Sequence, residues 1–273
     1  MRIATWNVNS IRSRQEHLLA WLERSRPDVV GLQETKVPDG DFPHEPLAAL
    51  GYQAAVSGQK TYNGVALLSP HGLEDVRVGF AALLPGDAEA EALGEQRRVI
   101  SAWVEGVRIV DLYVPNGSAL DSDKFAYKLA WLGCLHRYLD VQRAQGEPFC
   151  VLGDFNIAPE ARDLHDPAGL EGGIMASDAE REALRACLGE DLQDAFRLFE
   201  PDAGHWSWWD YRGGGWPRNR GWRIDHVYLC PLLQERAMGC SIDRDERGRE
   251  RPSDHAPVIV ELADEPDGED PEA

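Results

Sequence analysis

Short polar motifs adjoin the most apolar segments along the whole chain, and this arrangement restricts the fold to one in which many strand ends meet. Each motif lies beside a run of β-branched and aliphatic residues, as expected where a buried strand ends. Side chains at such positions stand on loops held by a rigid scaffold. We therefore expect one shared active site, formed by Trp6-Asn7, Gln33-Glu34-Thr35-Lys36, Tyr113-Val114-Pro115-Asn116, Gly153-Asp154-Phe155-Asn156, Arg223-Ile224-Asp225 and Ser253-Asp254-His255.

Strand-like segments outnumber helical ones. Helical patterns cover residues 14–25, 121–144 and 177–188, and the middle one places Leu129, Leu132, Leu135 and Leu139 on one stripe. Long strands joined by both tight turns and helices predict an α/β fold of two packed, mostly antiparallel sheets with helices outside. Strands are expected near residues 2–8, 28–33, 52–57, 63–69, 74–80, 97–105, 107–114, 148–153, 224–230 and 256–262.

The length and composition suit a single domain. A chain of 273 residues with 43% hydrophobic content can bury one sizeable core, and no linker or internal repeat divides it. We expect a catalytic domain over residues 1–262 and an acidic, disordered tail over 263–273. The start lacks the features of a signal peptide and no run reaches transmembrane length, so we expect a cytoplasmic protein without a membrane partner.

The five cysteines are scattered and odd in number, without CxxC spacing. This pattern indicates neither a disulfide framework nor a zinc site. Carboxylates and amides are instead the groups that a hard divalent cation and an attacking water require. Glu34, Asp154 and Asp254 are the natural metal ligands by this argument. For Glu34, pairing with Lys36 at a strand end is the alternative, and such surface pairs contribute little.

Asp154 and Asn156 are two residues apart, so they point the same way if the preceding strand continues through them. A D-x-N sequence also forms turns, and the residues alone leave both interpretations open. His255 precedes an apolar strand, and a carboxylate partner, for which Asp225 is the candidate, would fix its tautomer. We interpret the other histidines as structural or solvated, namely His17, His44, His71, His136, His165, His205 and His226.

The net charge of -19 is unusual for a protein that binds phosphates, but the acids are concentrated. Six lie in Asp264–Glu272 and four in the loop Asp87–Glu95, so the rest of the chain carries about -9. Residues 211–224 (YRGGGWPRNRGWRI) contain no acid and combine arginines with tryptophans, which suits a loop that grips a distorted duplex. The alternative is a Gly-rich hairpin whose tryptophans pack on the core.

These motifs, in this order, closely resemble the exonuclease III type of AP endonuclease within the endonuclease/exonuclease/phosphatase superfamily. The resemblance runs from about Met1 to Leu262 and includes LQETK at 32–36, Arg97-Arg98 and PSDHAPV at 252–258. It implies a four-layered α/β sandwich and a monomeric DNA-repair phosphodiesterase. Such an enzyme hydrolyses duplex DNA 5′ to an abasic site with one or two Mg²⁺ ions, Mn²⁺ being an alternative. It also implies 3′-to-5′ exonuclease and 3′-phosphatase activity on blocked 3′ ends.

The resemblance also assigns roles to residues. It implies a metal site of Asn7, Glu34, Asp154, Asn156, Asp254 and His255, and catalysis by Tyr113, Asp154, Asn156, Asp225 and His255. The assignment of Asp154, Asn156, Asp254 and His255 as ligands or as proton-transfer groups stays open. Trp208, Trp222 and Ile224 are implied to line a pocket for the extruded abasic sugar. The residues expected to contact DNA are Arg97, Asn116, Lys124, Trp208, Arg212, Arg220, Trp222 and Ile224.

Two alternatives remain. The first is another phosphoesterase of the same fold, such as a nonspecific DNase or a phosphatase of inositol phosphates or sphingolipids. The LQETK context, the Tyr113 motif and the Trp/Arg segment favour the DNA-repair branch. The second is an inactive DNA-binding or protein-interaction module, against which stands a complete set of expected ligands. The acid-rich loop Asp87–Glu95 looks longer than in a minimal member of the family.

Overall fold

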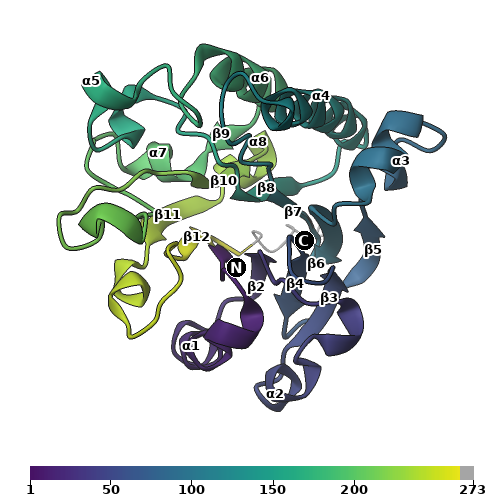
Figure 1. Ribbon diagram of the computed structural model, residues 1–273. Helices are drawn as coiled ribbons and strands as arrows, with labels where there is room; N and C mark the ends of the chain where they lie inside the picture. Colours follow the sequence, from purple (N-terminus) through teal and green to yellow (C-terminus); the bar gives the residue numbers. More distant parts are fainter. Residues whose placement is uncertain (265–273) are drawn as a thin grey trace, which may run out of the picture.

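Two six-stranded sheets lie face to face in the computed structural model, which describes residues 1–264 (Figure 1). The first has the order β11-β12-β1-β2-β4-β3 and the second β5-β6-β7-β8-β10-β9. The strands are β1 (Arg2–Asn7), β2 (Val29–Gln33), β3 (Gln53–Ser57), β4 (Val65–Ser69), β5 (Glu74–Val78), β6 (Val99–Val104), β7 (Val107–Tyr113), β8 (Phe149–Asp154), β9 (Gln193–Asp194), β10 (Asp225–Leu229), β11 (Ala237–Ile242) and β12 (Val258–Leu262).

Only β1–β2 and β7–β8 pair in parallel among these neighbours. The other neighbouring strands are antiparallel. The predicted α/β sandwich of two mostly antiparallel sheets is therefore confirmed.

Helices cover both outer faces (Figure 1). On the first sheet lie α1 (Ile11–Ser25) and α2 (His44–Ala49), and on the second lie α4 (Asp123–Ala144) and α6 (Asp178–Leu188). These make the four layers. The shorter helices are α3 (Ala88–Gly94), α5 (Pro167–Leu170), α7 (Ala195–Phe199) and α8 (Pro231–Gln234). None of the helices in residues 1–264 is long and apolar enough to cross a membrane.

Strand alternation decides which side chains reach the site. In β1, Ala4 and Trp6 belong to the core shared with α1, where the Trp6 and Trp21 ring centroids are 5.6 Å apart. Ile3 belongs instead to the core between the sheets. Because successive side chains of a strand face opposite ways, Asn7 is directed toward the second sheet. It is fully buried there, at the end of the strand.

The sheets approach each other closely below the site. A Cβ at Gly31 would lie 2.4 Å from Cδ1 of Leu152 and 2.8 Å from Oδ1 of Asp111, so a side chain there would separate the layers. Beside it, Gln33 Nε2 donates to Asp111 Oδ1 at 2.6 Å. Burial raises the pKa of Asp111 well above its usual range, despite this hydrogen bond. The contact joins β2 to β7 next to Glu34 and Tyr113.

Every strand expected from sequence is present, and its bounds differ from the predicted ones by at most two residues. The three predicted helices are also present, and their bounds differ by at most three residues. The short elements β9 and β11 and the short helices were not predicted. The description of Asp87–Glu95 as a loop is wrong, because residues 88–94 form α3. Asp87 caps this helix by accepting hydrogen bonds from the backbone N–H groups of Glu89 and Ala90. Of the predicted tail, only Ala263 and Asp264 lie within the described residues.

Candidate active site

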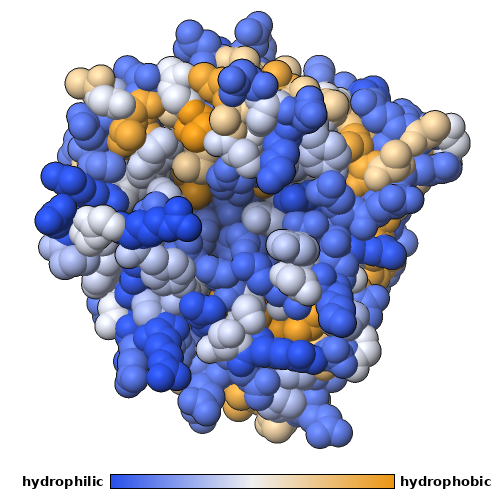
Figure 2. All heavy atoms as spheres, in the orientation of Figure 1, coloured by the Kyte–Doolittle hydropathy of each residue, from blue (hydrophilic) through white to orange (hydrophobic). Residues whose placement is uncertain are grey.

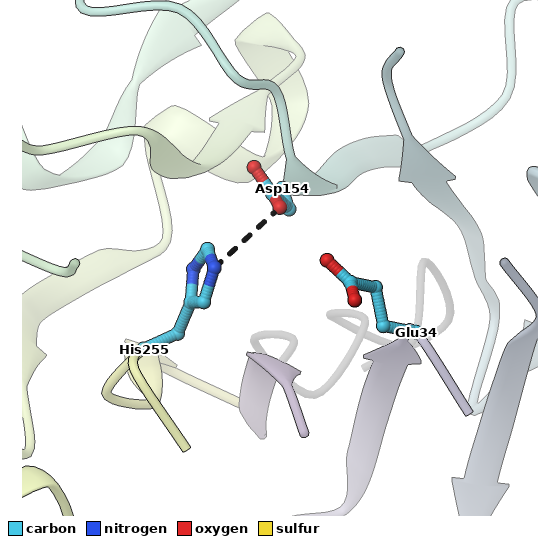
Figure 3. A group of neighbouring side chains, drawn as sticks. All are labelled: Glu34, Asp154 and His255. Atoms are coloured by element: carbon cyan, nitrogen blue, oxygen red, sulfur yellow. Dashed lines mark ion pairs between the residues drawn. The ribbon is translucent and has the colours of Figure 1, made fainter. Parts of the chain in front are cut away.

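The polar motifs meet at one edge of the sandwich, where β1, β2 and β8 end and where β10 and β12 begin. Figure 2 shows that the centre of this face is hollowed and lined mainly by hydrophilic residues. In Figure 3, Glu34, Asp154 and His255 point toward one another from three different segments. One potential ligand atom of each lies within 4.8 Å of the others. The expectation of one shared site therefore agrees with the geometry.

Asn7 joins the two carboxylates of this group. Its Nδ2 donates to Glu34 Oε1 at 2.9 Å and to Asp154 Oδ2 at 2.8 Å. Its own Oδ1 accepts the Asn9 N–H at 2.9 Å. The amide thus orients the carboxylates. Lys36 Nζ lies 2.6 Å from Glu34 Oε2, so the strand-end ion pair considered above exists alongside the shared site.

Tyr113 approaches Glu34 from β7. Its hydroxyl donates to Glu34 Oε1 at 2.9 Å. Burial, followed by the charges of Glu34 and Asp154, raises the pKa of Tyr113 well above its usual range. The phenol therefore remains a hydrogen-bond donor at the edge of the site. The Arg98 guanidinium stacks over the ring at 4.6 Å from its centroid.

His255 lies between two carboxylates. Its Nδ1 is 2.9 Å from Asp225 Oδ2, and its Nε2 is 3.8 Å from Asp154 Oδ2. Burial opposes the charged ring, but Asp225 and Asp154 outweigh it and raise the pKa of His255 to about 10. The predicted partner Asp225 is in place, and Ser207 Oγ donates to it at 2.6 Å. Sequence analysis missed Ser207.

Asp154 is 1% exposed, and its charged form is disfavoured. A carboxylate that is buried beside other carboxylates resists ionisation. Burial and then Asp225 and Glu34 raise its pKa to about 7, against the influence of His255 and Asn7. A cation at this position would favour the charged carboxylates. Two carboxylates at this spacing fit a divalent metal ion, with Glu34 and Asp154 as the groups that could hold it. Nε2 of His255 lies within the same group, but it could bind the ion only if the ring lost a proton.

Asn156 forms a turn as well as part of the site. β8 ends at Asp154, so the strand does not continue through Asn156. The interpretation that placed both side chains on one face of a continuous strand required such a continuation. Asn156 has φ 49°, and its N–H donates to Asp154 Oδ1 at 2.9 Å. Its Oδ1 accepts from Asn116 Nδ2 at 3.0 Å, and its Nδ2 donates to the Val114 carbonyl at 3.0 Å. The turn therefore ties the Asp154 and Tyr113 motifs together.

A buried ion pair supports this turn from behind. Lys128 of α4 donates to the Asn156 carbonyl at 2.7 Å and lies 2.5 Å from Glu180 Oε1 of α6. Both side chains are fully buried. Sequence analysis missed both residues, because a lysine within a helical pattern is usually exposed. The signal available was the N-terminal sequence of α6, where Ser177 and Glu180 form a capping box.

Asp254 lies beside the cluster rather than in it. Its Oδ1 accepts from Asn9 Nδ2 at 2.9 Å and its Oδ2 from Trp208 Nε1 at 3.0 Å. Burial raises its pKa, but His255 and these two donors together hold the pKa below its usual range. In this arrangement Asp254 positions Trp208 next to His255, and the two ring centroids are 6.4 Å apart.

An apolar cluster borders the polar site. Trp222 and Ile224 are buried in it and Trp208 packs against it, together with Ala158, Leu164, Met175, Ala176, Leu170 and Ile174. The Trp208 and Trp222 rings meet edge to face at 6.3 Å. The structure thus brings together the three residues expected to form the sugar pocket. Trp206 and Trp209 form a separate buried cluster with Ala256, and Trp216 packs against it. The two tryptophans of residues 211–224, Trp216 and Trp222, therefore both pack on apolar clusters, as the hairpin interpretation expects.

The basic residues lie around the rim. Arg212 and Arg220 are exposed in the loop between Trp209 and Trp222, and their guanidinium groups have no ion-pair partner in residues 1–264. Lys124 and Asn116 line a cavity of about 340 Å³ beside Tyr113. Arg98 lines the same cavity, whereas the predicted Arg97 is exposed outside it. The sequence contained both arginines, but the backbone just before β6 distinguishes them: Arg97 has φ 50°, whereas the Arg98 carbonyl accepts the Tyr113 N–H.

The chain was compared with known proteins. It matches the Endonuclease/Exonuclease/phosphatase family over residues 4–255. It is 36% identical to exodeoxyribonuclease III of Haemophilus influenzae, over 96% of this chain and 100% of that protein. A 3′ phosphatase from Neisseria, solved with a product DNA hairpin, is 40% identical with a TM-score of 0.90, over 96% of this chain and 99% of that one. An AP endonuclease from Archaeoglobus fulgidus is 36% identical with a TM-score of 0.89, with the same coverage of both chains.

Proposed function

Since the chain belongs to the endonuclease/exonuclease/phosphatase family, we propose that it is a DNA-repair phosphodiesterase that incises duplex DNA 5′ to abasic sites. Exonuclease and 3′-phosphatase activities accompany incision, in keeping with the names of the relatives. The observation that carries the proposal is the contact between two clusters. The acidic group of Glu34, Asp154 and His255 lies against the apolar group that includes Trp208 and Trp222. A phosphate can occupy the first while a sugar without a base occupies the second.

The metal is a divalent cation, which we propose to be Mg²⁺ because the surrounding ligands are mainly oxygen atoms. Glu34 and Asp154 would hold one ion, with the protonated His255 beside it, and Mn²⁺ would use the same two carboxylates. Asn7 orients both carboxylates through its amide. When bound, such an ion neutralises charge on the phosphate oxygens and lowers the pKa of a bound water.

Individual side chains carry out proton transfer and contact the phosphate. Asp154, whose ionised form a bound cation would favour, accepts the proton of the attacking water. His255, held cationic by Asp225, donates a hydrogen bond to a phosphate oxygen. Tyr113 and Asn156 bring further donors to the same phosphate. Incision leaves a 3′-hydroxyl and a 5′-deoxyribose phosphate without a covalent enzyme intermediate.

We infer the DNA contacts from the basic residues around the edge of the active site. Arg212 and Arg220 track the backbone on the loop, while Lys124, Asn116 and Arg98 contact phosphates near Tyr113. Arg97 contributes less, because it lies outside that cavity. Trp208, Trp222 and Ile224 accept the extruded sugar. We propose that the enzyme acts as a monomer in the cytoplasm, on duplexes with abasic sites or blocked 3′ ends.

Incision of a labelled duplex with one synthetic abasic site, in Mg²⁺ and in EDTA, tests the proposal. An undamaged duplex and an inositol phosphate serve as competing substrates, and Asp154→Ala is compared with Glu182→Ala, an exposed carboxylate of α6. We expect Mg²⁺-dependent cutting at the abasic site, lost in Asp154→Ala and retained in Glu182→Ala. Phosphate release from the inositol substrate without DNA cutting would identify a small-molecule phosphatase. Inactivity on all substrates would favour an inactive binding module.

A further inference from the structure

A second cavity, of about 230 Å³, lies on the outer face of the second sheet. Residues of α6, α7 and β10 line it, including Tyr228. Tyr228 follows Asp225 by three positions in β10, so the two side chains face opposite sides of the sheet. Figure 1 places α6 on the side of β10 that is remote from β1 and β2. The cavity is therefore separate from the active site.

Arginines dominate the wall of this cavity, which is notable in a chain with a net charge of -19. Most of them are paired: Asp163 contacts Arg197 and Arg223, Asp194 contacts Arg223, Glu160 contacts Arg162, and Glu171 contacts Arg181.

Arg185 is the exception. It lies exposed in the last turn of α6 and has no ion-pair partner among the described residues. The cavity wall thus keeps a cation that no carboxylate of the described chain neutralises.

The wall also presents buried hydrogen-bond donors without acceptors. Tyr228 Oη, Arg181 Nη2 and Arg197 Nε are all buried and have no hydrogen-bond partner in residues 1–264. Tyr228 is only 1% exposed, and burial raises the pKa of its hydroxyl well above the usual range, so the proton is retained. Buried polar groups are normally paired, and leaving a donor unpaired is costly. Unpaired donors call for a ligand rich in acceptor oxygens.

We propose that this arginine-lined cavity binds a small phosphate-class anion, either inorganic phosphate or the phosphate group of a nucleoside monophosphate. Guanidinium groups match the geometry of phosphate oxygens, and the Tyr228 hydroxyl adds a neutral donor. The volume is below the roughly 300–1,000 Å³ of sites for drug-sized ligands, so the ligand is small. Leu184 and Leu188 of α6 supply an apolar wall for any carbon skeleton attached to the phosphate.

Calorimetric titration of the EDTA-treated protein with inorganic phosphate, and separately with dAMP, tests the inference without DNA or metal. Tyr228→Phe removes only the hydroxyl, and Arg185→Gln removes the unpaired cation. Each is expected to weaken binding by roughly tenfold or more. Tyr62→Phe and Arg26→Gln, at exposed positions elsewhere, are the matched controls and should bind as the wild type does.

The ligand-free thermal midpoint gives an independent readout. Because the Tyr228 hydroxyl has no partner to lose, Tyr228→Phe should leave this midpoint unchanged or raised, which also shows that the variant folds. Tighter binding of dAMP than of phosphate would show that the leucine wall contacts the nucleoside, and equal affinity would show that the phosphate alone is held.

His255→Gln separates the cavity from the active site. Phosphate binding that survives in His255→Gln and weakens in Tyr228→Phe supports the inference, whether or not the protein cuts DNA. Binding that is lost in His255→Gln and intact in Tyr228→Phe would place the anion in the active site and overturn the inference. Absence of binding by both ligands would overturn it as well.

Discussion

His255 is charged because a carboxylate lies near each of its ring nitrogens, Asp225 at Nδ1 and Asp154 at Nε2. Each supports the imidazolium, and Asp225 does so through a direct hydrogen bond. Replacing this carboxylate by an amide keeps the shape and removes the charge. Burial is the largest single influence on the ring and lowers its pKa, so the charge on His255 depends on Asp225 and Asp154 acting together.

We predict that Asp225→Asn lowers the pKa of His255 by roughly one to three units in the metal-free protein. Wild-type His255 should stay protonated to about pH 10, whereas the variant should titrate at clearly lower pH. The measurement is an NMR titration of the ring Cε1–H signals in EDTA. The signal of His226, on the opposite face of β10, is the internal control. DNA incision should fall roughly 10²-fold or more, as when a donor to the charge that develops in the transition state is lost. An unchanged His255 titration would exclude this role for Asp225.

Between elements, the Lys128–Glu180 pair fixes α4 to α6 and supports the Asn156 turn. Removing one partner of a buried pair leaves an uncompensated charge, whereas removing both does not. We predict that Lys128→Met lowers the free energy of unfolding by about 3–5 kcal/mol, and that Lys128→Met with Glu180→Gln lowers it by less. Urea denaturation measures both. Lys124→Met, exposed one turn earlier, should change it by less than about 0.5 kcal/mol. Strict additivity of the two substitutions would refute the coupling.

The loop between Trp209 and Trp222 is anchored by packed side chains on one side and exposes its arginines on the other. Trp209 packs edge to face on Trp216 with centroids 4.9 Å apart, and the Arg244 guanidinium lies over both rings. Arg212 and Arg220 extend from this anchored loop. Each should contribute about one phosphate contact. One such contact changes the slope of log K for DNA binding against log salt concentration by about 0.9.

Arg212→Gln and Arg220→Gln are thus predicted to weaken duplex binding at low salt and to reduce that slope by about 0.9 each, with kcat little changed. Fluorescence anisotropy of a labelled duplex across a salt series measures the slope. Arg26→Gln, an exposed arginine at the end of α1, should leave the slope unaltered. A loss of affinity with an unaltered slope would mean that the arginines shape the loop instead of contacting phosphates.

Elements with a continuous or alternating apolar pattern could be predicted from the sequence, because that pattern reports burial directly. β11 could not, since its residues are half-buried or exposed and Met238 is 61% exposed. This strand exists because β12 offers it an edge. The site shows the same division. Glu34, Asp154 and His255 follow from motifs at strand ends, whereas Ser207, Lys128 and Glu180 act through partners far away in sequence. The choice of Arg98 over Arg97 needed the backbone geometry of the segment before β6.

At the scale of the whole molecule, buried charges link the outer layers to the second sheet. Arg223 contacts both Asp163 and Asp194, and it donates to His226 Nδ1 at 3.0 Å. His226 Nε2 lies 3.0 Å from the Ile157 carbonyl, which accepts the proton on that nitrogen. The ring is fully buried in its neutral form. Folding therefore depends on the protonation state of a residue outside the active site.

This arrangement predicts a loss of stability in mild acid. Burial and then the Arg223 charge lower the pKa of His226 from 6.5 to about 4. Between these values His226 binds a proton in the unfolded chain but not in the folded chain, so its contribution to the free energy of unfolding falls as the pH falls below about 6.5 and is constant above it. The contribution between pH 7.5 and 5 is about 2 kcal/mol. Asp154, with its pKa raised to about 7, acts in the opposite direction over the same range. Urea denaturation at both pH values should therefore show a change that is less favourable in the wild type and in His205→Gln, a half-exposed histidine, than in His226→Gln. An equal change in all of them would assign the acid sensitivity to the carboxylates that remain.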